Sequence, residues 1–369
     1  MDRRNRPALR QALRTRLDQM QGQVARWLGH LPDSVHHQLA EHLRHQTPFA
    51  TLDPSLSTLL ALRQWRRTAA LPEDLMARIE QGRVQLRTEM RHILHRPTPV
   101  GQVQNLQLPG PQPLALRRYV PSGGSTSPLP LLVFLHGGSF SSGDLDTHDE
   151  LCRLLCQLGQ LQVVAVDYRL APEHPFPAAV EDAFAAYAYC HAQARNWGAD
   201  PQRVAVGGDS AGGNLAAVLA AEYADRNDAP CAQLLIYPAI EFYRQTFSKQ
   251  HYGQGLFFSL PDYEQAYRLY NPTDRHDPRH PWLCPSYARH HRLAPALVVT
   301  AELDLLRDEG EQYAAQMRDG GTAVTLHRAA GMVHGFANMT PINRRAYQAV
   351  AQTAVDFRLL LDGLPHARR

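Results

Sequence analysis

The sequence predicts an α/β fold in which helices flank a mostly parallel central sheet. From residue 130 onward, short apolar runs recur, and helical patterns separate most of them. This alternation is typical of βαβ units, whose strands are covered on both faces and therefore read as continuous apolar runs. The 369 residues suffice for one large domain with an appendage, or for two or three smaller units. The predicted strands lie in PLLVFL, LQVVAVDY, RVAVGG, AQLLIYP, ALVVTAE and AVTLHRA.

Composition, charge and cysteine usage narrow the class of protein. Hydrophobic residues make up 44% and charged residues 20%, which excludes a disordered or collagen-like chain. The 38 basic and 35 acidic residues leave a net charge of +3, too small to indicate a nucleic-acid partner. Five cysteines without a CxxC pair indicate neither a disulfide framework nor a zinc site, and a reducing compartment fits them best. No apolar run approaches the ~18 residues of a membrane span, so we expect a cytoplasmic protein without stable membrane insertion.

Residues 1–95 are predicted to form a helical N-terminal region, and residues 96–369 the α/β domain. The first region lacks strand-like alternation. At its start, the spacing of Leu9, Leu13 and Leu17 favours an amphipathic surface helix over a membrane-binding segment or a transit peptide. The helical patterns are interrupted by prolines, which cannot continue a helix, at Pro32, Pro48, Pro54 and Pro72.

Two further segments depart from the repeating pattern. Residues 103–108 and 113–120 alternate like half-buried strands, and LPGPQP between them supplies a turn, so we expect a hairpin. The interval between Tyr237 and Pro295 is far longer than an ordinary connection and is rich in Tyr, Phe, His and Pro. We expect an insertion over about 240–292 that carries a lid or a binding surface.

The most informative motif is GDSAG, residues 208–212, which follows a predicted strand and leads directly into a predicted helix. A serine at such a sharp turn takes up strained dihedral angles and projects its Oγ from the edge of the sheet. Gly208 and Gly212 are expected because side chains there would collide with the neighbouring strand and helix. Ser210 is therefore the predicted nucleophile, and the amide of Ala211 is expected to face a developing oxyanion.

A second group of oxyanion donors is expected after the strand PLLVFL. His136-Gly137-Gly138-Ser139-Phe140 follows it, and glycines allow main-chain amides to approach a substrate oxygen closely. These glycines could alternatively form only a turn. We predict an oxyanion hole from Gly137, Gly138 and Ser139 together with Ala211.

A serine nucleophile needs a base, and a carboxylate that holds the base in the right tautomer. Of the 19 histidines, most lie in polar, arginine-rich segments, whereas His334 follows the last predicted strand. Asp304 follows the strand ALVVTAE and would reach the same edge of the sheet. Its competitors are Glu302, which is still at the strand end, and Asp308 and Glu309, which have a sufficient role at a helix N-terminus.

The motifs HGGSF, DYRLAPEHPFPAA, GDSAGGN, DLLRDEG and HGF occur in this order over about residues 130–340. As a set they resemble the hormone-sensitive-lipase-like esterases of the α/β-hydrolase fold, in their bacterial GDSAG branch. The resemblance implies carboxylic ester hydrolysis by Ser210, Asp304 and His334, with no metal or cofactor. It also implies a helical cap built from the N-terminal region and the insertion over about 240–292.

The sequence departs from that family at three places. Ser139 stands where the family usually has a third glycine, which places a Cβ beside the acyl or alcohol pocket. This Cβ is expected to affect whether esters of bulky alcohols fit. The usual DPL is Asp304-Leu305-Leu306 here, which removes a rigid proline but keeps the carboxylate. The helical region before residue 95 is longer than the family's usual short cap.

Several further residues are candidates for binding or support. Phe140, Asp209, Phe257 and Phe258 are predicted to contact the substrate, the last two as apolar walls of the insertion. His148 and Asp144 are weaker candidates for the same role. An ion pair between Arg169 and Glu173 is expected to anchor loops near the site.

The sequence thus predicts a serine carboxylesterase that hydrolyses short- to medium-chain esters through an acyl-enzyme intermediate. Its expected partner is a small-molecule ester, with a homodimer left open. Two alternatives stay open at this point: an amidase or peptidase with the same triad, and a non-catalytic small-molecule binder on the same scaffold.

Overall fold

The computed structural model of the chain describes residues 22–42, 49–65, 73–94, 96–110, 113–124 and 127–364. Within these ranges the strands form one eight-stranded sheet in the order β1-β2-β4-β3-β5-β6-β7-β8. Strands β3 to β8 run parallel to one another, as the sequence predicts. The strands are β1 (Gln102–Leu108), β2 (Leu114–Val120), β3 (Leu129–Leu135), β4 (Gln162–Val166), β5 (Ala199–Asp209), β6 (Gln233–Ile236), β7 (Ala296–Leu303) and β8 (Val324–Val333).

The predicted hairpin is present as β1 and β2, which pair antiparallel over their whole length. Strand β2 then pairs antiparallel with β4, so the hairpin extends the parallel sheet at one edge. Residues of β1 are mostly exposed, whereas those of β2 alternate between buried and half-buried. The predicted hairpin is therefore present, but the expectation that both of its strands are half-buried is wrong for β1.

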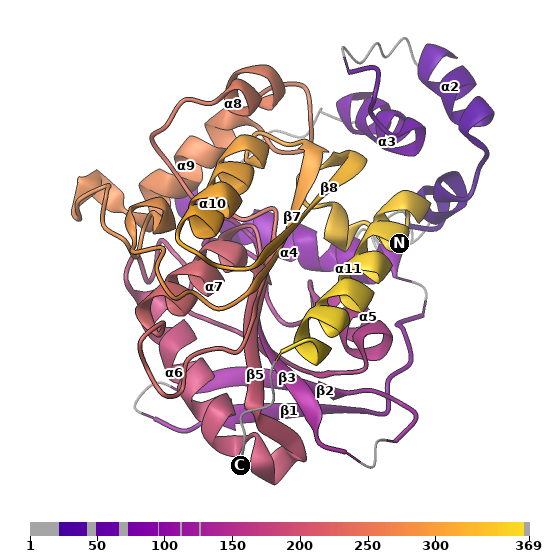
Figure 1. Cartoon of the computed structure of the whole chain (residues 1–369). Coiled ribbons are helices and arrows are strands. Elements are labelled where there is room, and N and C mark those ends of the chain that lie inside the picture. The colour runs from indigo at the N-terminus through magenta and orange to yellow at the C-terminus, as the bar shows by residue number, and fades with distance from the viewer. Residues whose placement is uncertain are drawn as a thin grey trace, which may run out of the picture.

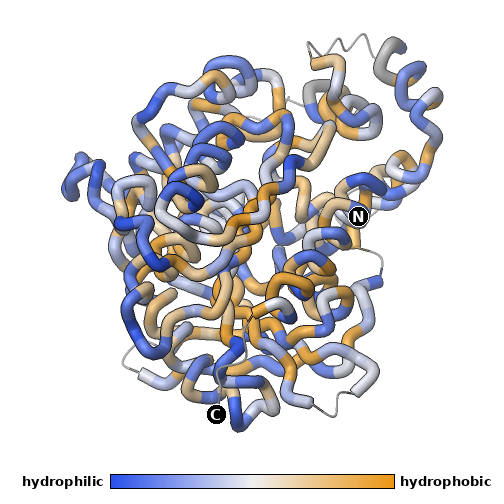
Figure 2. The backbone as a smooth tube through the Cα atoms, viewed as in Figure 1, coloured by the Kyte–Doolittle hydropathy of each residue, from blue (hydrophilic) through white to orange (hydrophobic). Residues whose placement is uncertain are grey.

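Helices cover both faces of the sheet because successive residues of each strand point to opposite sides. Leu131, Val133 and Leu135 of β3 pack with helices α6 (Ala178–Gln193), α7 (Ala211–Glu222) and α10 (Arg307–Asp319). Leu132 and Phe134 of the same strand pack with α5 (Asp149–Gly159) and α11 (Arg344–Asp362) on the other face. Figure 1 shows this layering, and hydrophobic residues follow the strands through the interior in Figure 2.

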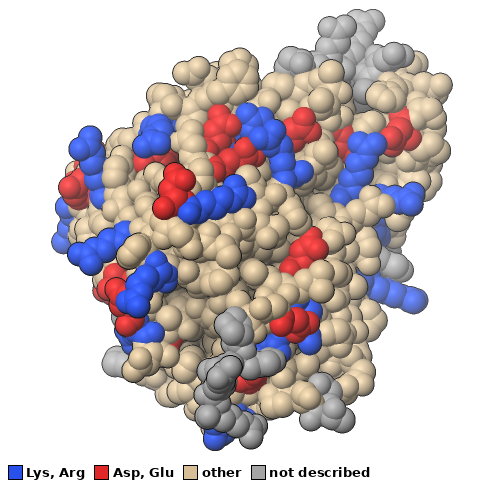
Figure 3. Space-filling view, in the orientation of Figure 1, with Lys and Arg blue, Asp and Glu red and all other residues tan. Residues whose placement is uncertain are grey.

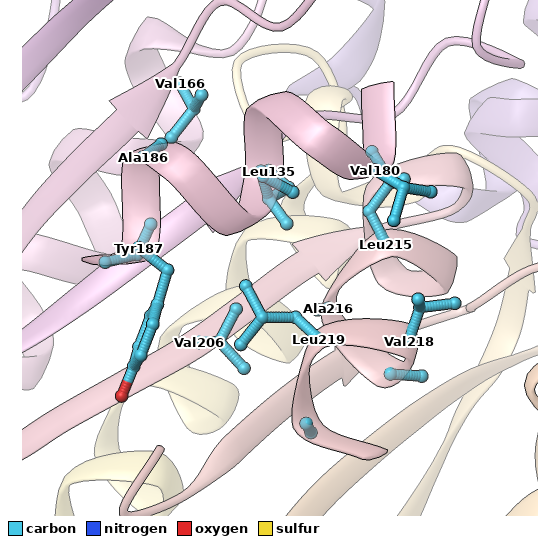
Figure 4. Packing of buried hydrophobic residues seen from close by; sticks show 14 of the residues in the cluster. Leu135, Val166, Val180, Ala186, Tyr187, Val206, Leu215, Ala216, Val218 and Leu219 are labelled. Carbon is cyan, nitrogen blue, oxygen red and sulfur yellow. The ribbon is translucent and has the colours of Figure 1, made fainter. Parts of the chain in front are cut away.

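The first of these two layers is drawn closely in Figure 4. Leu135 and Val206, from adjacent strands, lie against Leu215 and Leu219 of α7, and Tyr187 of α6 closes the cluster. Helix α7 is buried along almost its whole length. The helix that follows the predicted nucleophile is therefore held rigidly within the core.

The N-terminal region is helical in the part that the structure describes. Helix α2 (Asp33–His42) begins directly after Pro32, and α3 (Pro54–Trp65) begins at Pro54, as expected for a residue tolerated in the first turn. Helix α4 (Leu75–Ile93) follows the N-cap residue Asp74, whose carboxylate accepts the amide of Ala77. The prolines at 48 and 72 and the leucines at 9, 13 and 17 lie outside the described residues.

The predicted insertion contains two helices, α8 (Phe247–Tyr252) and α9 (Leu260–Tyr270). Helix α9 starts at a capping box in which Ser259 and Asp262 each accept the other's backbone amide. Described residues of the N-terminal region contact the insertion through a hydrogen bond and a ring contact, among others. Arg63 of α3 donates to the carbonyl of Phe257 at 3.1 Å, and the Phe49 and Tyr252 rings meet edge to face at 5.4 Å.

Surface charge agrees with the small net charge. On the face drawn in Figure 3, basic and acidic side chains are interspersed and form no large area of one sign. Among the helices of the described ranges, none is both long enough and apolar enough to cross a membrane.

Candidate active site

Ser210 stands at a sharp turn between β5 and α7. Its backbone has φ +53° and ψ −117°, which is strained for a residue with a side chain. The turn is tight because a Cβ at Gly212 would lie 1.9 Å from the carbonyl oxygen of Leu135, and one at Gly208 would lie 2.4 Å from the backbone of Gly212. The two glycines therefore allow α7 to start directly against the ends of β3 and β5. This is the collision that the sequence motif implies.

The structure brings Ser210, His334 and Asp304 together in one chain of hydrogen bonds, here called the triad. Ser210 Oγ lies 2.9 Å from His334 Nε2, and His334 Nδ1 lies 2.8 Å from Asp304 Oδ2. The other oxygen of Asp304 accepts the amide of Leu306 at 2.9 Å, and the carboxylate is fully buried. This arrangement holds the histidine with Nε2 directed at the serine.

The competing carboxylates are engaged elsewhere. Glu302 accepts the amide of Gly331 at 2.7 Å. Asp308 accepts an amide of α8 at 2.8 Å. Glu309 is more than a helix-terminal acid, because it is buried and forms an ion pair with Lys249 at 2.7 Å. None of the three contacts the histidine of the triad.

The glycine loop, residues 136–142, follows β3 beside the triad. The amide of Gly137 donates to Asp209 Oδ1 at 2.8 Å, so the predicted role of Gly137 as an oxyanion donor is not available to it. Among the described residues, no acceptor bonds the amides of Gly138, Ser139 or Ala211. Three of the four predicted donors therefore have amides free to bind a substrate oxygen.

Three consecutive residues of the glycine loop have positive φ angles, and two of them are not glycines. Gly138 has φ +122°, and Ser139 and Phe140 each have φ +57°, a region that residues with side chains rarely adopt. Each non-glycine residue there costs on the order of 1–3 kcal/mol. Phe140 was predicted to contact the substrate, but its ring is buried and stacks on Tyr270 of α9 at 3.8 Å. It anchors the loop to the insertion instead.

Asp209 was also predicted to bind substrate, and the structure gives it a different place. It is 2% exposed and is surrounded by Gly137, Tyr237 and His148, whose Nε2 lies 3.3 Å from the carboxylate. Burial opposes its charged form, but His148 and the Gly137 amide hold the pKa of Asp209 below its ordinary value. Burial, with the nearby His148, lowers the pKa of His136 to about 4. Asp209 therefore positions the glycine loop as an anion.

The insertion reaches the triad through Phe258. Its ring stacks on the imidazole of His334 with centroids 4.7 Å apart. The Tyr237 ring is tilted against the same imidazole, with centroids 4.9 Å apart. Phe257 instead packs into the core cluster on the α5 and α11 face, beneath Arg63. Tyr237 was missed in the sequence, although its place at the end of an apolar strand was a usable signal.

The expected ion pair between Arg169 and Glu173 is wrong. Arg169 binds Asp182 of α6 at 2.8 Å, and Glu173 binds Arg83 of α4 at 2.7 Å. Both residues lie on the segment after β4, but their side chains diverge to helices on different sides. Proximity in sequence was a poor guide because the partners come from distant elements.

The five cysteines are free, and all but Cys231 are buried. Burial raises the pKa of the Cys152 and Cys156 thiols, so neither is a reactive thiolate. Within the described ranges, no three His, Cys, Asp or Glu side chains are grouped so that they could hold a metal ion.

A family profile that describes the α/β hydrolase fold matches residues 132–338, more than half of the chain. The chain is 43% identical over 300 residues to the carboxylic ester hydrolase LipN of Mycobacterium tuberculosis, with 78% of each chain covered. It is 42% identical over 219 residues to an ethyl acetate hydrolase of Pseudomonas putida, covering 58% of this chain and 68% of the relative.

Solved structures that are similar to this chain are also esterases. A hyperthermophilic esterase from the archaeon Pyrobaculum calidifontis is 36% identical and superposes with a TM-score of 0.76, covering 84% of this chain and 98% of the esterase. The predicted fold class and the predicted resemblance are both confirmed. The chain therefore belongs to the α/β-hydrolase fold family, among the hormone-sensitive-lipase-like esterases that its motifs resemble, and is an enzyme of that class.

Proposed function

We propose that this enzyme is a serine carboxylesterase that cleaves short- to medium-chain carboxylic esters through an acyl-enzyme intermediate. The observation that carries the proposal is the hydrogen-bonded triad of Ser210, His334 and Asp304, with contacts of 2.9 and 2.8 Å. It lies beside three backbone amides that have no acceptor among the described residues. Nucleophile, base and oxyanion donors thus occur at one point of the fold.

In the first half of the reaction, Ser210 Oγ attacks the ester carbonyl carbon while His334 Nε2 takes the hydroxyl proton. Asp304 accepts a hydrogen bond from the Nδ1–H of His334 without taking the proton, which keeps Nε2 free as a base and stabilises the imidazolium that forms. The amides of Gly138, Ser139 and Ala211 donate hydrogen bonds that stabilise the negative charge on the carbonyl oxygen. Each positioned donor of this kind raises the rate by about 10² to 10³.

His334 then gives its proton to the departing alkoxide, so that an alcohol leaves and the acyl group stays on Ser210. Water repeats the sequence: His334 removes a proton from it, the hydroxide attacks the acyl carbon, and the serine recovers its proton as the acid leaves. Every proton moves through one imidazole, so the same contact serves both halves of the reaction.

The preference for short to medium acyl groups rests on how the site is covered. We propose that the N-terminal region and the insertion form a cap, with Phe258 above His334 as one wall. A buried methylene adds about 0.8 kcal/mol until a wall is met, which favours roughly two to eight carbons. The similarity to an ethyl acetate hydrolase supports the short end of this range.

The test is turnover of p-nitrophenyl esters from acetate to dodecanoate by the wild-type enzyme and by Ser210→Ala. The variant should lose nearly all activity and keep its fold, and an organophosphonate should label the wild type at Ser210. Ser122→Ala is the matched control, since Ser122 lies at the opposite edge of the sheet, after β2, and should behave as wild type. A fully active Ser210→Ala enzyme would refute the proposal.

The same experiment separates the two alternatives. Matched p-nitroanilides, run beside the esters, should be cleaved far more slowly, because an amine is the poorer leaving group. Faster cleavage of the anilide would assign an amidase. Saturable binding without turnover of any ester would assign a small-molecule binder.

A further inference from the structure

The glycine loop needs support that its own sequence does not provide. Ser139 and Phe140 both adopt left-handed backbone angles, although neither is a glycine. Such a conformation persists only where surrounding contacts over-determine it. The amide of Ser139 can serve as an oxyanion donor only while this conformation lasts. The contacts at the exit of the loop therefore matter for the reaction.

One side chain from the N-terminal region makes those contacts. Arg83 of α4 donates from Nε to the carbonyl of Ser141 at 2.7 Å and from Nη2 to the carbonyl of Ala171 at 3.0 Å. Ala171 in turn donates its amide to the carbonyl of Phe140 at 2.8 Å. The guanidinium thus joins the exit of the glycine loop to the strand of chain that already holds Phe140.

The orientation of Arg83 is itself fixed. Glu173 accepts from both terminal nitrogens of the guanidinium, at 2.7 and 2.9 Å, which is the bidentate geometry that arginine forms best. The side chain of Arg83 is 11% exposed. Because Glu173 fixes the planar guanidinium, its nitrogens can hold the two backbone carbonyls at a set separation. The single nitrogen of a lysine cannot do this.

The next arginines along the same helix differ in what they contact. Arg87 and Arg91 follow at one-turn intervals and pair with the side chains of Asp144 and Asp146. Arg91 is 67% exposed and bonds no backbone carbonyl among the described residues. Arg83 therefore differs from Arg91 in that it donates a hydrogen bond directly to the backbone of the glycine loop.

We propose that Arg83 is a positioning residue for the oxyanion hole, supplied to the catalytic domain by helix α4. It touches no substrate and acts by holding the backbone from Ser139 to Ser141 in its strained conformation. The inference rests on the proposed esterase function. It also gives the long N-terminal region a defined task in the reaction, beyond covering the site.

The test compares Arg83→Gln, Arg83→Lys and Arg91→Gln in the full-length enzyme, with p-nitrophenyl butyrate as substrate. Loss of one oxyanion donor lowers the rate by about 10² to 10³, so a misplaced donor should lower kcat by about tenfold to a hundredfold. KM should stay within about twofold, because ground-state binding does not use the oxyanion hole fully. Arg83→Lys should lose kcat to an intermediate extent, and Arg91→Gln should match the wild type.

A second measurement excludes a merely structural role. A boronic acid that forms a tetrahedral adduct on the serine should bind Arg83→Gln more weakly, by the same factor as the loss in kcat. Wild-type kcat and boronate affinity in Arg83→Gln would overturn the inference. If Arg83→Gln fails to fold, Arg83→Lys decides: a folded lysine variant with wild-type kcat and boronate affinity would also overturn it.

Failure of this inference can be told apart from failure of the proposed function. If Ser210→Ala is inactive while Arg83→Gln keeps full kcat, the esterase assignment stands and the positioning role is wrong. If Ser210→Ala is active, the proposed function itself fails. In that case the boronate has no serine adduct to report, and the positioning role fails with it.

Discussion

Replacing Lys249 by methionine should destabilise the enzyme strongly. Lys249 is the single lysine of the chain, lies on α8, and forms an ion pair with Glu309 of α10 in which both side chains are 1% exposed. Its ammonium also donates to the carbonyls of Glu241 and Arg244 and lies 4.9 Å from the ring centre of Tyr263. The pair ties the insertion to the helix that follows the aspartate of the triad.

The size of the effect follows from what the variant leaves behind. Burial raises the pKa of Glu309 even with Lys249 beside it, so the carboxylate depends on its partner. Removing one member of a buried pair costs about 3–5 kcal/mol, which corresponds to a Tm lower by roughly 4–7 °C in a chain of 369 residues. The loss should shrink at low pH, because protonation of Glu309 removes the unpaired buried charge.

The double variant Lys249→Met with Glu309→Gln should recover about half of that loss or more. Glutamine keeps an oxygen for the amides of Ile240 and Glu241 and for the Tyr263 hydroxyl, but carries no charge. Urea unfolding followed by circular dichroism measures the free energy of unfolding of the wild type, the single variant and the double variant.

A matched control is the exposed pair of Arg292 and Asp225, which lie 3.3 Å apart with both side chains mostly in solvent. Arg292→Met should change the free energy of unfolding by no more than about 0.5 kcal/mol. A Lys249→Met variant within about 1 kcal/mol of the wild type, or a double variant no more stable than the single one, would refute the reasoning.

Three further predictions concern other parts of the molecule. Gly212→Ala should prevent folding or activity, since its Cβ would meet a strand carbonyl, whereas Gly82→Ala, with nothing within 4 Å, should stabilise α4 by about 0.5–1 kcal/mol in urea unfolding. Buried His136, with a pKa lowered to about 4, stays neutral while the unfolded state takes up a proton, so stability should fall by on the order of 3 kcal/mol as pH drops from about 7 to 4; His136→Asn should flatten this slope. Phe258→Ala should shift the optimum acyl length in kcat/KM measurements, and Phe257→Ala should lower Tm and leave that optimum unchanged; the opposite pattern would contradict the cap geometry.

The elements that sequence alone determined are those governed by local rules. The apolar runs of the parallel strands, the hairpin before them and the starts of α2 and α3 at prolines follow from periodicity and backbone restriction. The strand-turn-helix around Ser210 belongs with them, because the glycine spacing admits few other conformations. His334 and Asp304 could be predicted since carboxyl ends of parallel strands meet at one edge of the sheet.

Only the tertiary structure determined which partners the polar side chains around the site bind. Asp209 lies next to the serine in sequence and was expected to bind substrate, but packing turned it toward Gly137 and His148. Arg169 and Glu173 found partners on helices that the sequence does not place near them.

Lys249 gives the same lesson for the insertion. Nothing in its neighbourhood along the chain predicts a buried pair with Glu309, sixty residues later. A side chain several bonds long can reach partners in many directions, and only the packed positions of distant elements select one of them. Backbone pattern is read from neighbours in sequence, whereas side-chain pairing depends on neighbours in space.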